Sequence, residues 1–116
     1  IFIHSSKDKG ISVGEKSKVE IQNIIIEDSS IGITSKDDSV VQVRDYHNNN
    51  LNYIAASYVK KNNFGPAEIN FYNYDKSINN EIIVDKYSFI KFNYDSSAKN
   101  KVIYSNINSE IIEYIK

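Results

Sequence analysis

The stretch GISVGEKSKVEIQN at residues 10–23 returns one repeat later as GITSKDDSVVQVRD at residues 32–45. Gly10 falls on Gly32 in this repeat, and Ile11 and Val19 fall on Ile33 and Val41. Strand-forming residues alternate with polar ones, which is the period of a β-strand with one buried face. A strand-built repeat of this length predicts a β-solenoid, in which each repeat forms one turn, here called a coil.

The alternation continues through two further coils and defines three columns of inward-facing side chains. The spacing between successive coils is the same in every column, and its middle step is the longest, so that step contains an insertion. Because inward residues of one coil stack on those of the next, we expect each column to keep one character, small, β-branched, or large and apolar. The columns are Ser17, Ser39, Ala67 and Ser88; Val19, Val41, Ile69 and Ile90; and Ile21, Val43, Phe71 and Phe92.

An earlier strand of each coil forms a second inward set, in which the last step is the longest. The extra residues therefore lie between Ala56 and Ala67, which predicts a protruding loop at residues 57–66, closed by Pro66. Loops on a solenoid rim commonly carry specificity. The members of this set are Ile11 and Val13, Ile33 and Ser35, Ile54 and Ala56, and Ile82 and Val84.

The turns and the chain ends follow the same pattern. Asn23, Asp45 and Asn73 stand two residues after the last inward position, where Asn and Asp tolerate the left-handed conformation of a sharp turn. Residues 1–4 align with residues 24–27 at the repeat step and predict a third strand per coil. The last residues, NSEIIEYIK, predict a short helix that begins after Asn108 or Ser109 and carries Ile111, Ile112 and Ile115 on one side.

The V-x-I strand followed by Asn, the G-I-x-x opening and the repeat of about 22 residues resemble the right-handed parallel β-helix proteins of the pectin-lyase-like class. The resemblance covers residues 1–94, and right-handed coiling is what it implies. We therefore expect an all-β chain, a single-stranded right-handed parallel β-helix over residues 1–107 with about 21–22 residues per coil. A capping helix is expected at residues 108–116 to cover the open end, with an oligomer contact as the alternative.

Composition excludes several classes of function. The 14 Lys+Arg residues balance 15 Asp+Glu and include one arginine, so the basic surface typical of nucleic-acid binding is missing. No apolar run approaches the roughly 18–20 residues of a membrane span, and without cysteine there are neither disulfides nor thiolate metal sites. The chain starts IFIHSS, in the middle of an expected strand. We expect it to be the C-terminal part of a longer, exported or cell-surface protein.

Catalytic groups are sparse in the sequence. Adjacent carboxylates serve as acid and base in glycosidases, and Asp37, Asp38 and Asp45 would be the candidates if the chain were an enzyme. Their counterpart one coil earlier is Glu15–Lys16, which favours a solvated corner instead. The histidines, His4 and His47, have no Cys or second His at ligand spacing, and Asp28, Asp45 and Asp75 occupy different offsets, so we predict no metal and no cofactor.

Aromatic and basic residues are the remaining signal. Tyr46 and Tyr74 directly follow equivalent turn residues and are expected to point outward as a strip that contacts sugar rings or a protein. Tyr58, Lys60, Lys61 and Phe64, on the expected loop, complete the predicted binding residues. The sequence favours a non-catalytic scaffold or a carbohydrate- or protein-binding module. The alternatives are a fragment of a polysaccharide lyase or glycoside hydrolase, and a trimeric fibre or tailspike element.

Overall fold

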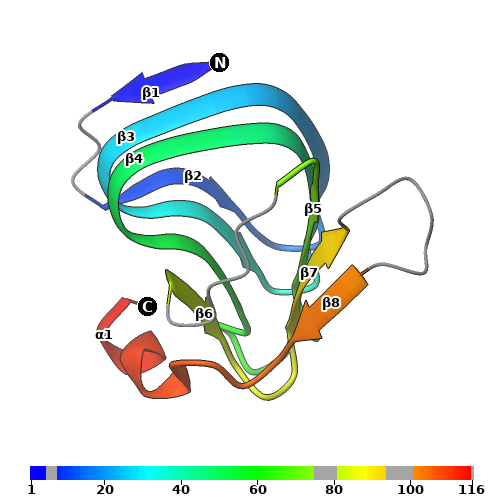
Figure 1. Cartoon of the computed structure of the whole chain (residues 1–116). Coiled ribbons are helices and arrows are strands. Elements are labelled where there is room, and N and C mark those ends of the chain that lie inside the picture. The colour runs from blue at the N-terminus through cyan, green and yellow to red at the C-terminus, as the bar shows by residue number, and fades with distance from the viewer. Residues whose placement is uncertain (5–7, 75–80, 94–100, 116) are drawn as a thin grey trace.

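The computed structural model describes residues 1–4, 8–74, 81–93 and 101–115. As predicted, it is a β-solenoid, with about four coils and 64% of the described residues in strands (Figure 1). The long curved strands β3 and β4 lie one above the other and pair along most of their length. The strands are β1 (Phe2–His4), β2 (Lys9–Val13), β3 (Lys18–Lys36), β4 (Val40–Tyr58), β5 (Glu68–Tyr72), β6 (Ile82–Val84), β7 (Phe89–Asn93) and β8 (Lys101–Tyr104); a 3-10 turn (Ser109–Ile111) and the helix α1 (Ile112–Ile115) follow.

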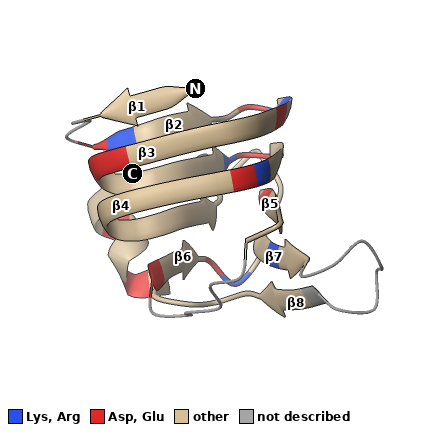
Figure 2. Cartoon of the chain, turned by 45° about the horizontal axis from the view of Figure 1, so that its top comes forward, with Lys and Arg blue, Asp and Glu red and all other residues tan. Residues whose placement is uncertain are grey.

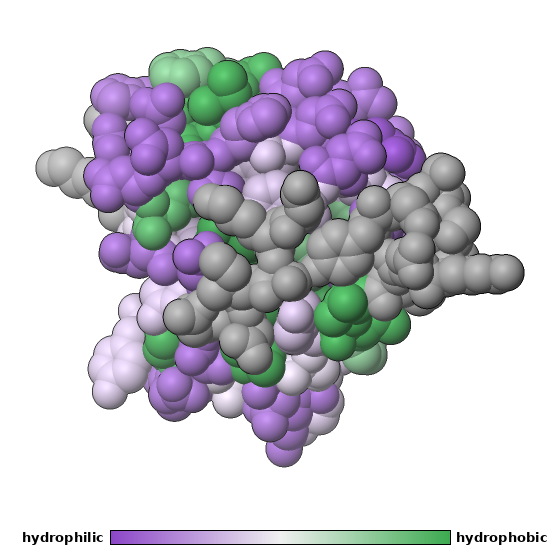
Figure 3. Space-filling model, in the orientation of Figure 1, coloured by the Kyte–Doolittle hydropathy of each residue, from purple (hydrophilic) through white to green (hydrophobic). Residues whose placement is uncertain are grey.

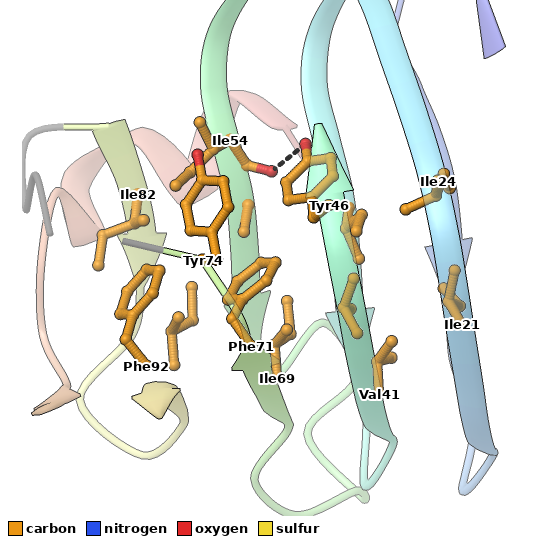
Figure 4. Close-up of a cluster of buried hydrophobic side chains, with 14 of the residues drawn as sticks. Ile21, Ile24, Val41, Tyr46, Ile54, Ile69, Phe71, Tyr74, Ile82 and Phe92 are labelled. Carbon is orange, nitrogen blue, oxygen red and sulfur yellow. Dashed lines mark hydrogen bonds between the residues drawn. The ribbon is translucent and has the colours of Figure 1, made fainter. Parts of the chain in front are cut away.

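The parallel register of β3, β4, β5 and β7 confirms the predicted columns. Val19 pairs with Val41, Val41 with Ile69, and Ile69 with Ile90. The third column pairs in the same way and ends in Phe71 and Phe92, both fully buried. Figure 4 shows side chains of this core stacked along the inside of the coil. Equivalent residues lie above each other because a parallel ladder keeps equivalent strands in step.

Aromatic rings continue this stack, and they correct the expected outward strip. Tyr46 and Tyr74 are only 2% and 7% exposed. Their rings pack on Phe71 at centroid distances of 5.5 Å each, and the Tyr46 hydroxyl donates a 3.0 Å hydrogen bond to the carbonyl oxygen of Ile54 (Figure 4). Burial raises the pKa of Tyr46 well above its ordinary value. The prediction failed because the left-handed turn residue before each tyrosine interrupts the period-2 alternation.

The earlier strand has a register different from the predicted one. Ile33 pairs with Ala55 and Ala55 with Ile82, while Ser57 pairs with Ser35 and Val84. The assignments of Ile54 and Ala56 to the inward set were therefore each one position too early. Ile54 and Ala55 both belong to the inner cluster, so the strict alternation of inward and outward residues does not hold at these two positions.

Strand β1 confirms the third strand that was expected at residues 1–4 and 24–27. Phe2 pairs with Ile25 and His4 with Glu27, in parallel. Paired residues of β1 and β3 are 23 positions apart in the sequence, whereas Ile11 of β2 and its partner Ile33 are 22 apart. The register of β1 is therefore displaced by one residue relative to that of β2.

The corners are made by residues with positive φ, as predicted for Asn23, Asp45 and Asn73, which have φ of 54°, 56° and 57°. The Asn73 amide donates to the Asp45 carboxylate at 3.3 Å, and at another corner the Asn50 amide donates to Asp28 at 2.7 Å. These bonds run from one coil to the next. Asn and Asp therefore both permit the turn and join neighbouring turns.

The short C-terminal helix expected at residues 108–116 is present at residues 109–115, but a different element covers the last coil. Strand β8 runs antiparallel to β7, and Ile107 forms an antiparallel bridge with Val84, so the last coil is covered by returning strand. Helix α1 instead packs on the outer face of the sheet, where Ile112 belongs to a cluster with Ile31, Ala56, Tyr58 and Ile83. Figure 1 places α1 beside β6. The helix is lateral because its apolar side matches an apolar outer face of the sheet.

The strap formed by residues 107–115 reaches from the last coil to the first. The Asn108 amide donates to the carbonyl oxygen of Ile82 at 2.8 Å, and the Lys9 ammonium group donates to the carbonyl oxygen of Ile115 at 3.3 Å. Asn108 does occupy the position before the helical turn, but its side chain makes no capping bond there. The strap therefore ties β2 to β6 across the intervening strands.

Substitution Ile112→Ala is expected to lower the free energy of unfolding by about 2–5 kcal/mol, because it empties space under the strap at a site that is 6% exposed. Chemical denaturation followed by circular dichroism measures the loss. Tyr114→Ala, at an 87% exposed position of the same helix, is the control and should change stability little. Equal effects of the two substitutions would contradict the lateral packing of α1.

Substitution Gly32→Ala is expected to destabilise the fold by about 3 kcal/mol, the upper end of the cost of overpacking. A Cβ atom at Gly32 would overlap the Tyr46 hydroxyl and lie 2.6 Å from the carbonyl oxygen of Ile54. Gly14→Ala is the matched control, since its Cβ would meet Lys36 at 3.6 Å, an ordinary contact. Denaturation midpoints that fall equally for both variants would show that Tyr46 does not occupy this space.

Candidate functional site

The loop that was expected at residues 57–66 begins two residues later, because Ser57 and Tyr58 still pair with β3 at the end of β4. Residues 59–66 lead from β4 toward β5, and Asp37 of the preceding coil anchors them. One carboxylate oxygen of Asp37 accepts backbone hydrogen bonds from Lys60 at 2.7 Å and Lys61 at 3.0 Å. Asp37 is 2% exposed, so the expectation of a solvated corner is wrong for this residue. A buried carboxylate with two N–H donors holds a loop firmly, because removing it would leave both donors unsatisfied.

Two more aspartates complete the anchorage of the loop. Asp38 accepts a 2.8 Å bond from the backbone N–H of Gly65, and its own N–H donates to the Gly65 carbonyl oxygen at 3.1 Å. Asp85, one coil further on, accepts a 2.8 Å bond from the N–H of Val59. The first three residues of the loop and Gly65 near its end are thus tied to carboxylates of the coils on either side.

Asp37 and Asp38 reach these positions because both are in the left-handed conformation, with φ of 52° and 65°. Together they form the two central residues of a tight turn, closed by a 3.2 Å bond from the Ser39 N–H to the Lys36 carbonyl oxygen. Asp45 lies at another corner, within the curved strand β4, where its carboxylate accepts a hydrogen bond from the Asn73 amide. The structure does not bring the three candidate catalytic carboxylates together.

A polar hollow of about 270 Å³ lies beside the start of the loop. Lys61 forms an ion pair with Glu15 across it, while Lys36 and Lys60 add two further ammonium groups. Burial, followed by the charges of Lys60 and Lys9, lowers the pKa of Lys36. Several cations therefore approach one another here, and a bound anion would reduce their repulsion. The lining residues are Ser12, Gly14, Glu15, Lys36, Asp37, Lys60 and Lys61.

A second hollow of about 310 Å³ uses the other residues of the loop. Its aromatic members are Phe64, which is partly buried, and Tyr87, which is 56% exposed. Lysine ammonium groups lie near both rings, Lys16 at 5.9 Å from the Phe64 centroid and Lys86 at 5.1 Å from that of Tyr87. Aromatic faces, an amide and nearby cations thus share one hollow. Val59, Asn62, Phe64, Gly65, Pro66 and Tyr87 line it.

Three of the six predicted binding residues are placed at these hollows and three are not. Lys60 and Lys61 line the polar hollow and Phe64 lines the aromatic one. Tyr46 and Tyr74 lie inside the coil, and Tyr58 is 0% exposed. The prediction that these tyrosines offer a surface is wrong, for Tyr58 because α1 covers its face of the sheet. Burial, with the carboxylates of Asp8 and Asp37, raises the pKa of Tyr58 to about 12.

Sequence reasoning missed Lys36, Glu15, Asn62 and Tyr87 as lining residues. Glu15 could have been found from the sequence, because it is the equivalent, one repeat earlier, of Asp37, the residue directly after Lys36. Tyr87 is distant from the loop in sequence, and its corner reaches the loop because β6 pairs with β4 and β7 with β5, with Asp85 also bound to Val59.

Figure 2 shows acidic and basic residues interspersed along the coil. Figure 3 shows a mainly hydrophilic surface with separate hydrophobic patches on the face in view. No helix in the described ranges has the length and apolar character needed to cross a bilayer.

Comparison of the chain with protein-family models, with curated proteins and with solved structures finds no match. The assignment of a β-solenoid therefore depends on the repeat and the strand register of this chain. Membership in the pectin-lyase-like class remains a proposal.

Substitution Asp37→Ala is expected to destabilise the protein by about 1–3 kcal/mol and to expose the Lys60 and Lys61 amides, because their shared acceptor is removed. Hydrogen exchange of those two amides, measured by NMR, should accelerate. Asp37→Asn retains a side-chain oxygen acceptor and should have the smaller effect, and Glu20→Ala, on the exposed face of β3, should have none. Unchanged exchange in Asp37→Ala would contradict the anchoring role.

Proposed function

We propose that this chain is a non-catalytic β-helix module of the right-handed, pectin-lyase-like type that binds an acidic polysaccharide at the loop of residues 59–66. The rigid coil serves as the scaffold and the loop with its two hollows serves as the contact surface. The observation that carries the proposal is a loop held at three points, with exposed aromatic rings and lysines around it. A protein that binds such a polysaccharide would be exported or located at the cell surface, and we propose this location for the chain.

Preorganisation supports a binding role for the loop. Binding costs less when the contact residues are already ordered, because less conformational entropy is lost. The backbone N–H groups of residues 59, 60, 61 and 65 all donate to aspartate carboxylates of other coils. Phe64 and Tyr87 are thereby held on a fixed frame with parts of their rings accessible. Sugar rings present flat C–H faces that pack on such rings.

Charge supports an acidic ligand. The carboxylates of Asp37, Asp38 and Asp85 already accept backbone N–H groups, and Glu15 is paired with Lys61. Lys36 and Lys60 stand together in the polar hollow, while Lys16 and Lys86 lie over the two rings. A glycan with carboxylate or sulfate groups would complement these ammonium groups.

A non-catalytic role is favoured over hydrolysis or elimination by the use made of the carboxylates. Asp37 and Asp38 bind the loop backbone, and Asp45 joins a different corner to Asn73. An acid and base pair for glycoside cleavage requires two carboxyl groups that face one sugar across a gap. The described part of the chain does not offer these three residues in that arrangement.

Titration of the chain with polygalacturonate or alginate oligosaccharides, followed by tyrosine fluorescence and NMR, is expected to show saturable binding that neutral dextran does not show. Phe64→Ala and Tyr87→Ala should each weaken binding about two- to tenfold, the value of one aromatic contact. Lys60→Gln should weaken it and reduce its dependence on salt. The matched controls are Tyr114→Ala and Lys18→Gln, which change exposed residues outside the lining of the two hollows.

Other outcomes of the same experiment identify the alternatives. No binding to any polysaccharide would leave only the scaffold role. Release of reducing or unsaturated ends that is lost in Asp37→Asn or Asp38→Asn would establish an enzyme. Sedimentation that gives a trimer would favour a fibre element.

A further inference from the structure

A cluster of three potential metal ligands lies at a corner of the first two coils, separate from the loop. It consists of His4 in β1 and Glu27 and Asp28 in β3. His4 pairs with Glu27 in the parallel register of these strands, which brings residues far apart in the sequence into contact. The ligand atoms of all three side chains lie within 4.8 Å of one another.

We propose that His4, Glu27 and Asp28 form a binding site for a divalent transition metal of the Zn²⁺ class. The Nδ1 atom of His4 lies 3.5 Å from an oxygen of Glu27 and 3.5 Å from an oxygen of Asp28. Tetrahedral zinc with bonds of about 2.0–2.2 Å places neighbouring ligand atoms about 3.4 Å apart. The two distances from the imidazole nitrogen therefore match two edges of a tetrahedral zinc site.

The ligand types favour zinc over the hard cations. One imidazole nitrogen with two carboxylates suits zinc and cobalt, whereas calcium takes six to eight oxygens. His4 and Asp28 have side-chain exposures of 52% and 39%, which leaves the remaining coordination position open to water. The site is therefore expected to bind metal reversibly.

Asp28 is oriented by a partner outside the ligand set. The Asn50 amide of the next coil donates to the other carboxylate oxygen of Asp28, Oδ1, at 2.7 Å, while Oδ2 faces His4. Partners of this kind fix the direction of a ligand and raise metal affinity. The site thus extends over three successive levels of the solenoid.

Metal at this position would join β1 to β3. Strand β1 is short and pairs with β3 alone among the described strands. A ligand that binds only the folded arrangement stabilises it by mass action. Zinc is therefore expected to raise the melting temperature and to slow hydrogen exchange in residues 2–4.

Isothermal titration calorimetry of the full chain with ZnCl₂ tests the site, with CaCl₂ and MgCl₂ in parallel. We expect one zinc ion per chain and no comparable heat from calcium or magnesium. Bound Co²⁺ should show the visible absorption of a tetrahedral site, and zinc should shift the imidazole NMR signals of His4. His4→Gln and Asp28→Asn should each lower zinc affinity about tenfold or more.

His47→Gln is the matched control. His47 is the other histidine of the chain, is exposed, and lies opposite Ile25 rather than a carboxylate. Circular dichroism shows whether each variant folds, and Glu27→Gln supplies a second variant if His4→Gln does not. The proposal is overturned if zinc fails to bind, if His47→Gln weakens binding as much as His4→Gln, or if calcium binds equally well.

Discussion

Parallel hydrogen bonding between equivalent strands of successive coils is the constraint on which this structure depends. Because β3, β4, β5 and β7 keep one register, each inward side chain lies above a side chain of similar character. The aromatic stack of Tyr46, Phe71 and Phe92 and the coil-to-coil amide bonds at the corners follow from that register. A slip by one residue would turn the whole apolar column toward solvent, so the buried columns maintain the register as much as they result from it.

Polar residues at the corners both turn the chain and form hydrogen bonds to the neighbouring coil, which apolar side chains cannot do. Residues with positive φ turn the chain without glycine, and their side chains then bind backbone or amide groups of the neighbouring coil. Asp37 and Asp38 show how a tight corner can become the support of an insertion: the two carboxylates hold a loop whose backbone would otherwise lack partners. The repeat tolerates this loop because β5, which follows it, pairs with β4 in the same parallel register as the other coils.

Closure of the solenoid is achieved by elements that do not repeat. Strand β8 runs back along β7, and the strap that ends in α1 crosses the outer face from β6 to the neighbourhood of Lys9. Inner and outer apolar clusters are therefore distinct, one formed by stacked columns and the other by the strap. The two hollows at the loop and the His4 site lie at corners of the solenoid. Side chains there lie outside the inner and outer apolar clusters and can contact ligands.

The sequence by itself determined the coil, its three inner columns, the left-handed turn residues and the position of the inserted loop, since all of these repeat along the chain. It did not determine the direction of Tyr46, Tyr58 and Tyr74, or the register around Ile54, because left-handed turn residues and the covering helix interrupt the alternation of inward and outward residues. Tertiary structure alone decided which distant side chains meet. Glu15 reaches Lys61, Asp85 reaches Val59 and His4 reaches Asp28 only because stacking places separate coils about 4.8 Å apart.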